Sequence, residues 1–144
     1  MSLTGAYDPD NIFAKIIRGE APAVRIFEDD ATLAFMDVFP QSEGHSLVVH
    51  KRSRARNLLE IEPDHLHELM DAVQRLARAS AKALAPDAVL VSQFNGEAAG
   101  QTVFHLHFHV IPRWANRPLG RHAGGGMADR GRLEELAKKI SAAA

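Results

Sequence analysis

Three histidines, His105, His107 and His109, occupy every second position of one segment, with apolar residues between them. In a β-strand successive side chains point to opposite faces, so the three imidazoles would share one face of a sheet. Neighbouring imidazoles would be rooted roughly 6.5–7 Å apart, which is about the span of a phosphate group. Imidazoles titrate near neutral pH, so a rigid row of them indicates nucleophilic or proton-transfer chemistry. The intervening apolar residues would face a core: Phe104, Leu106, Phe108 and Val110.

A metal site is another interpretation of the same spacing. Two strand histidines at i and i+2 can share an ion, but the outer pair would be roughly 13 Å apart and cannot. The chain has no cysteine, and the nearest acid downstream is Asp129, so a third ligand would have to come from elsewhere. A strand that merely carries histidines on its outer face is the third interpretation, although strict alternation of three is improbable by chance. Spacing alone therefore leaves metal binding open.

A loop of small residues, Gly96 to Thr102, comes directly before the histidines. Small residues let backbone N–H groups approach an anion closely, and the side chains of Gln101 and Thr102 add neutral donors. Most loops of this composition are simply turns. The position of this loop, immediately before the histidines, indicates a phosphate site.

Length and composition limit the classes of protein that need to be considered. The chain has 144 residues, of which 46% are apolar and 24% charged, with a formal net charge of −1. These values are typical of one soluble globular domain and give no case for electrostatic binding to nucleic acid or membranes. No apolar run is long enough to span a bilayer, and the N-terminus lacks the hydrophobic stretch of a signal peptide. We therefore expect a cytoplasmic enzyme or binding protein.

The order of predicted elements indicates an α+β fold. A short helix from Asp10 should end at Gly19, and a long amphipathic helix should begin at Pro63 and end before Pro86. The connections are too short for repeated parallel crossovers, so we expect a five-stranded antiparallel sheet with helices packed on it. The predicted strands cover residues 24–27, 32–36, 46–50, 88–94 and 103–111, and a C-terminal helix carries an apolar stripe over residues 133–140.

The segment His105-Leu106-His107-Phe108-His109-Val110-Ile111 resembles the signature of the histidine-triad family of nucleotide hydrolases and transferases, in its Hint-like branch. Residues 11–20, 34–40, 44–49 and 95–103 are similar to further blocks of the family, in the same order. The similarity extends from about Ile12 to Arg113. It implies a single domain of the HIT-like fold over residues 1–144, with a core of about residues 10–113 and a variable tail and helix over residues 114–144.

The resemblance implies a two-step reaction at the α-phosphate of a nucleotide. His107 would attack phosphorus as a neutral imidazole and form a nucleotidyl-histidine, which water then hydrolyses. The backbone carbonyl of His105, the first histidine, would keep the proton on the other ring nitrogen of His107. His109 would donate to a nonbridging phosphate oxygen, while His105 would lie behind the site. His45 would pack close to the triad.

The resemblance also implies a set of binding residues. Asp37 would accept hydrogen bonds from both ribose hydroxyls, although an acid just before Pro40 is equally expected to cap a turn. The phosphate or leaving group would be contacted by loop residues: Asn95, Gly100, Gln101 and Thr102. The base would lie in an apolar slot, whose residues would otherwise be interpreted as ordinary core: Ile12, Phe13, Ile16, Phe35 and Leu47.

Two departures from the family pattern concern metal. Many bacterial members carry Cys-x-x-Cys at the first helix and hold zinc with these cysteines and two histidines, but here the pair is Asn11 and Ala14. The family usually has Pro-basic-basic-His after the third strand, where this chain has His50-Lys51-Arg52-Ser53. Both cysteines and one histidine are missing, so we expect no structural zinc, no other metal and no cofactor.

The resulting hypothesis is a nucleotide phosphoramidate or nucleotidyl hydrolase that acts on purine nucleotides. Two alternatives stay open: a dinucleoside polyphosphate hydrolase, and a nucleotide-binding regulatory protein whose turnover is incidental. The resemblance also suggests a homodimer built around the long helix and the fourth strand, without nucleic acid or membrane partners. Four histidines have no partner pattern and are expected at the surface: His50, His65, His67 and His122.

Overall fold

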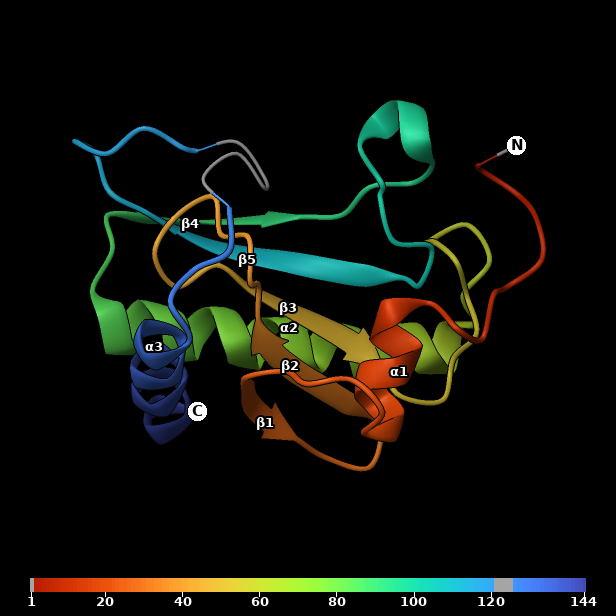
Figure 1. Ribbon diagram of the computed structural model, residues 1–144, viewed down its shortest axis with the longest axis horizontal. Coiled ribbons are helices and arrows are strands. Elements are labelled where there is room, and N and C mark those ends of the chain that lie inside the picture. Colours follow the sequence, from red (N-terminus) through yellow and green to blue (C-terminus); the bar gives the residue numbers. More distant parts are fainter. Residues whose placement is uncertain (1, 121–125) are drawn as a thin grey trace.

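The computed structural model describes residues 2–120 and 126–144, which form one antiparallel sheet with helices on both faces (Figure 1). The strands are β1 (Arg25–Glu28), β2 (Thr32–Met36), β3 (Ser46–His50), β4 (Ala88–Ser92) and β5 (His107–Arg113), in the sheet order β1-β2-β3-β5-β4. The helices are α1 (Ile12–Arg18), α2 (Pro63–Leu84), the short 3-10 helix η1 (Glu97–Ala99) and α3 (Arg130–Ala143). The predicted α+β class with five antiparallel strands is confirmed.

The two faces of the sheet carry different cores. On one face, α1 packs Phe13 and Ile16 against a small apolar cluster from β2 and β3. On the other, α2 and α3 cover a larger core that includes Leu76 and Ile140, both with no exposed surface. Figure 1 shows α1 in front of the sheet and α2 running behind it. The α1 face therefore carries the smaller apolar cluster and the α2 face the larger one.

Local signals explain where α1 begins and ends. The helix begins at Ile12 rather than at the predicted Asp10, and the side chain of Asn11 caps it by accepting a hydrogen bond from the Ala14 N–H at 2.9 Å. Gly19 ends it in the left-handed conformation, with φ of 79°, as predicted. The cap places Ile12 and Phe13 in the first turn of the helix, beside the sheet.

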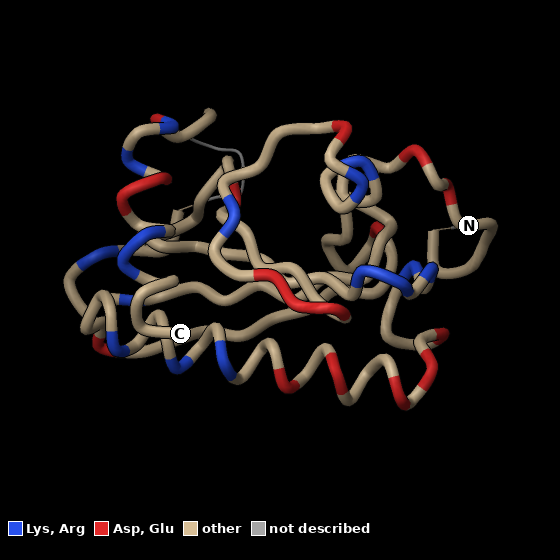
Figure 2. Tube along the Cα trace, turned by 90° about the horizontal axis from the view of Figure 1, so that it is seen from below, with Lys and Arg blue, Asp and Glu red and all other residues tan. Residues whose placement is uncertain are grey.

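The long helix α2 is placed by its amphipathic pattern and its charges. Leu69, Val73 and Leu76 face the sheet and are buried. Acidic residues gather near its N-terminus and basic residues near its C-terminus (Figure 2), which complements the helix dipole. Within residues 2–120 and 126–144, none of the helices combines the length and apolar character that a membrane crossing requires.

The fifth strand differs from the prediction, because it covers His107–Arg113 instead of residues 103–111. Its partner β3 ends at His50, and the last pair between them joins Val49 to His107. His105 therefore lies just before the strand, while Leu106 donates its N–H to the Ala55 carbonyl at 3.0 Å. Phe104, expected in the core, is half-buried beneath the Arg56 guanidinium. Two histidines of the triad lie on the strand and one precedes it.

Gly44, next to His45, should be intolerant of any side chain. Its φ is +86°, and a Cβ there would lie 2.5 Å from Leu84 Cδ1 and 3.1 Å from Pro112 Cγ. Gly44→Ala combines left-handed strain with overpacking, so we expect a loss of about 2–4 kcal/mol in unfolding free energy. Gly19→Ala is the matched control, because its φ is +79° but nothing lies within 4 Å. The control should lose about 1 kcal/mol; equal losses in urea unfolding would contradict this account.

Candidate active site

A cavity of about 620 Å³ opens on the α1 face of the sheet. It brings together side chains from α1, β2, β3, the loop before the triad and β5. The predicted site residues that line it are Ile12, Phe13, Ile16, Phe35, Asp37, Leu47, Thr102, His107 and His109. The apolar residues expected to surround a base and the two strand histidines therefore share one cavity.

Strand register explains why the imidazoles lie beside apolar residues. Phe35 pairs with Leu47, which pairs with His109 on the next strand. Paired residues of neighbouring strands lie on the same face, so His109 continues a row that begins with two apolar residues. A second row of paired residues on the same face runs from Leu33 through Val49 to His107. The rings of Phe13 and His107 are nearly perpendicular, with their centroids 4.8 Å apart.

The tautomer of His107 follows from its backbone partner. Nδ1 of His107 lies 2.7 Å from the carbonyl oxygen of His105. A carbonyl can only accept a hydrogen bond, so Nδ1 carries the proton. In the neutral imidazole the lone pair is then on Nε2, the nitrogen on the opposite side of the ring. The geometry gives this cavity-lining residue the form of imidazole that can act as a nucleophile.

A second backbone group sets the protonation of His45 and His109. The N–H of Gln41 donates to Nδ1 of His45 at 3.0 Å, so the proton of neutral His45 is on Nε2. That nitrogen lies 2.9 Å from Nδ1 of His109. When the Nε2–H of His45 donates there, neutral His109 carries its own proton on Nε2. The cavity then contains one imidazole nitrogen that can attack and another that can donate a hydrogen bond.

Asp37 lies beside this histidine pair and is 4% exposed. Its Oδ1 accepts a hydrogen bond from the Phe39 N–H at 2.8 Å, which is the turn-capping role considered from the sequence. Its Oδ2 lies 3.3 Å from Nε2 of His45. Asp37 also lines the cavity. The turn contact and a position beside a bound nucleotide are therefore compatible.

His105 is buried and does not line the cavity. Its Nε2 lies 3.3 Å from the His50 carbonyl and its Nδ1 lies 2.7 Å from the Tyr7 hydroxyl. The carbonyl only accepts, so the His105 proton is on Nε2 and the Tyr7 hydroxyl donates to Nδ1. Burial lowers the pKa of His105 from 6.5 to about 4, so the ring is neutral at physiological pH.

Three predicted phosphate-loop residues shape the loop instead of lining the cavity. Gln101 is buried, donates to the Arg56 and Val103 carbonyls and accepts from the Gly96 N–H. The side-chain oxygen of Asn95 accepts from the Leu58 N–H at 2.9 Å. Gly100 is exposed and has φ of 108°. Of the four loop residues, Thr102 alone is at the cavity.

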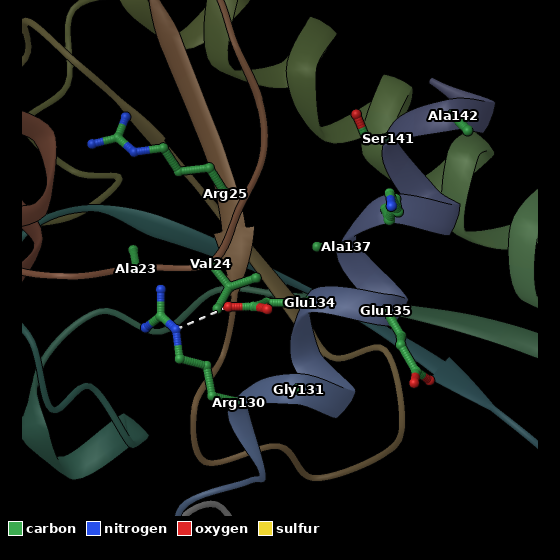
Figure 3. Close-up of a pocket in the computed structure, with 11 residues that line it drawn as sticks. Ala23, Val24, Arg25, Arg130, Gly131, Glu134, Glu135, Ala137, Ser141 and Ala142 are labelled. Atoms are coloured by element: carbon green, nitrogen blue, oxygen red, sulfur yellow. Dashed lines mark hydrogen bonds and ion pairs between the residues drawn. The ribbon is translucent and has the colours of Figure 1, made fainter.

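The C-terminal region forms a wall of the cavity that the sequence patterns did not reveal. The lining includes Met127, Ala128, Arg130 and Leu133, and Ala128 donates its N–H to the Val38 carbonyl at 2.9 Å. Arg130 also lines a second, more open cavity of about 820 Å³ between α3 and the segment before β1 (Figure 3). The amphipathic pattern of α3 predicted a helix, but no local pattern indicated that the first turn of this helix would line the cavity.

Two groups of potential metal ligands occur among the described residues. One is Asp37, His45 and His109; the other is His50, His65 and Glu68. A histidine that binds metal normally donates its other ring N–H. In both groups that other nitrogen instead accepts from the backbone: His45 Nδ1 from Gln41 as described above, and His50 Nδ1 from Arg52 and Ser53. Nε2 of each ring therefore carries a proton where a metal would need a lone pair.

The histidines outside the triad are only partly at the surface. His67 is exposed as predicted, but the prediction for His50 was wrong, because it is 1% exposed and its Nε2 lies 3.0 Å from Glu68 Oε1. His65 is half-buried and its ring stacks near that of His50, with centroids 4.3 Å apart. His122 lies outside the described residues.

Comparison with known proteins shows extensive similarity. The HIT domain family model matches residues 18–116. The chain is 39% identical over 120 residues to adenylylsulfatase HINT3 of Arabidopsis thaliana, covering 79% of this chain but only 60% of that protein. It is 39% identical over 106 residues to adenosine 5′-monophosphoramidase hnt1 of Schizosaccharomyces pombe, covering 71% and 73% of the two chains. The crystal structure of a Hit-like protein involved in cell-cycle regulation from Bartonella henselae matches with a TM-score of 0.92 and 48% identity, over 97% of this chain and 100% of that one.

Stability should fall as the pH falls through the window set by His105. Its pKa drops from 6.5 to about 4 on folding, so between these values the unfolded chain binds more protons than the folded one. Burial lowers the pKa of His50 as well, which acts in the same direction. We expect His105 to account for a loss of up to about 3 kcal/mol between pH 6.5 and pH 4. Urea unfolding should show a shallower pH dependence in His105→Gln; an unchanged slope would contradict the assignment.

Proposed function

Because this chain belongs to the histidine-triad (HIT) family, we propose that it hydrolyses nucleotides at the α-phosphate through a covalent nucleotidyl-histidine on His107. The preferred substrates are purine nucleotides whose α-phosphate carries an amine-linked or acyl leaving group. Two relatives support this class: one is named an adenylylsulfatase and the other an adenosine 5′-monophosphoramidase. Both names describe an adenosine nucleotide from which a group on the phosphate is removed.

The observation that carries the proposal is the tautomer of His107 at the cavity. With Nδ1–H bonded to the His105 carbonyl, Nε2 presents its lone pair to an α-phosphate bound in the cavity. Attack forms an Nε2–phosphorus bond while the bond from phosphorus to the leaving group breaks, and an amine leaving group takes a proton from solvent water while His107 keeps its Nδ1 proton. Water then attacks phosphorus and releases a proton to solvent as the nitrogen–phosphorus bond breaks; its electron pair returns to Nε2, so the nucleoside monophosphate leaves and neutral His107 is restored.

Other groups of the cavity are assigned to the phosphate, the ribose and the base of the nucleotide. The Nε2–H of His109 is a fixed donor for a nonbridging oxygen as charge develops on the phosphate. Asp37, next to His45, is in reach of a ribose that follows the phosphate into the cavity. Phe13 and Phe35, whose rings meet edge to face at 5.4 Å, form part of an apolar slot for the base. No metal is assigned to the reaction.

The exposed edge of the sheet supports the homodimer suggested by the resemblance. The edge strand β4 leaves Leu90 and Val91 exposed by 38% and 42%, and Met70 on α2 is exposed by 40%. An edge strand with exposed apolar side chains is a template for pairing with another chain. The proposed dimer joins two copies through α2 and β4.

His107→Ala should abolish turnover and leave nucleotide binding nearly intact, because it removes the nucleophile but little binding surface. We expect a fall in kcat of several orders of magnitude. The assay compares adenosine phosphoramidates, acyl-adenylates and dinucleoside polyphosphates, with His67→Ala on the exposed face of α2 as the control. Turnover within about tenfold of the parent would remove His107 from its role. A parent that binds nucleotides without turnover would favour the regulatory alternative.

Asp37→Asn should weaken ribonucleotides far more than their 2′,3′-dideoxy counterparts. A carboxylate can accept from both hydroxyls, whereas the amide accepts on one side only. We expect a loss of about 1–3 kcal/mol in affinity for ribonucleotides and almost none for the dideoxy analogues. Titration calorimetry with both ligands and a melting curve check this. If Asp37 only stabilises the turn by accepting from the Phe39 N–H, the variant should lose affinity equally for both ligands and its melting temperature should fall. That outcome would contradict a contact with the ribose.

A further inference from the structure

We propose that Tyr7 is a positioning residue of the active site: by donating its hydroxyl proton to His105, it holds the backbone carbonyl that orients His107. Tyr7 lies in the N-terminal segment, ahead of residues 18–116, which match the family model. The inference rests on the function proposed above, because it gives Tyr7 its effect through the nucleophile of that reaction.

The contacts form a continuous chain from Tyr7 to His107. The Tyr7 hydroxyl lies 2.7 Å from Nδ1 of His105, and Nε2 of the same ring lies 3.3 Å from the His50 carbonyl. Both ring nitrogens are therefore engaged, and the ring is held from two sides. The carbonyl of the same residue accepts from Nδ1 of His107 at 2.7 Å. Holding the ring restricts the backbone that carries this carbonyl.

His105 needs such support because it lies outside the strand. The hydrogen-bonded ladder between β3 and β5 reaches only to His107, so the sheet does not fix the carbonyl two residues earlier. The Leu106 N–H bonds to Ala55 and anchors the backbone on one side. The imidazole, with 2% of the residue exposed, provides the second anchor. Without the Tyr7 hydroxyl, Nδ1 of His105 would lose its hydrogen-bond donor.

At the positions where the family resemblance implies zinc ligands, the residues of this chain do not fit a zinc ion. Ala14 offers no ligand atom, and the Asn11 side chain already caps α1. The Ser53 hydroxyl accepts from the Ala55 N–H at 3.1 Å. Tyr7 precedes Asn11 by four residues, and the guanidinium of Arg54 lies 5.7 Å from the centre of its ring. The hydrogen bond from Tyr7 instead joins the N-terminal segment to His105.

Tyr7 is the only tyrosine in the sequence, which makes the proposal testable with a single-atom change. Tyr7→Phe removes the hydroxyl and keeps the ring. We expect kcat for an adenosine phosphoramidate to fall roughly tenfold, as for other residues that orient a reacting group, while KM and the affinity for the nucleoside monophosphate stay within about twofold. Arg54→Met is the matched control, because it removes the cation over the ring and leaves the hydroxyl in place.

A spectroscopic measurement separates this role from a general loss of stability. Nitrogen NMR of 15N-labelled histidines should show hydrogen-bonded Nδ1 in His105 and protonated Nδ1 in His107 in the parent. In Tyr7→Phe both signals should move, while those of His65 and His67 stay in place. Uniform incorporation of 3-fluorotyrosine changes Tyr7 alone, and the fluorine beside the hydroxyl makes that hydroxyl a more acidic donor. The substitution should retain kcat and shift the Nδ1 signal of His105, and it serves as the test if the Phe variant does not fold.

The outcomes distinguish this inference from the proposed function. Unchanged kcat and unchanged histidine signals in Tyr7→Phe, with an active parent, would overturn the role of Tyr7 and leave the hydrolase proposal standing. An inactive parent would overturn the hydrolase proposal, while the NMR signals would still show whether Tyr7 controls His107. In the fluorotyrosine protein, an unmoved His105 signal would likewise overturn the inference.

Discussion

The hydrogen bond from Nδ1 of His107 to the carbonyl of His105 is the interaction on which the site depends. A carbonyl accepts and never donates, so this one contact determines which imidazole nitrogen keeps a lone pair. The same logic applies at His45, where the Gln41 N–H can only donate. Backbone groups, whose hydrogen-bonding roles are invariant, thus assign the protonation of several neighbouring side chains at once.

The fold places this interaction at the start of a strand. His107 and His109 belong to β5 and face the cavity in register with apolar residues of β3, whereas His105 precedes the strand. An alternating sequence therefore serves two purposes: two imidazoles reach the cavity, and the third turns into the protein. Burial keeps that third ring neutral, which allows its Nδ1 to accept from Tyr7. The buried ring of His105 and the cavity-lining ring of His107 are thus only two residues apart in the chain.

Much of this arrangement could be predicted from the sequence, because its signals are local. Period-two alternation predicted a strand at β5, Gly19 predicted the end of α1, and the family resemblance predicted several of the residues that line the cavity. What could not be predicted depends on contacts between distant segments. Tyr7 is 98 residues from His105, and no pattern marks their contact. The burial of His50 depends on where α2 packs, and the wall that includes Arg130 depends on where the tail returns. The predicted start of β5 was wrong for the same reason, because β5 begins at His107, where its pairing with the end of β3 begins.

The stereochemical course at phosphorus tests the central claim most directly. A nucleoside 5′-phosphoramidothioate of known configuration, hydrolysed in oxygen-18 water, yields a product whose configuration can be assigned. Attack by His107 followed by attack by water makes two in-line displacements, and each inverts phosphorus. The account therefore predicts net retention. Net inversion would show that water attacks the α-phosphate directly, and that the lone pair on Nε2 of His107 is not the nucleophile.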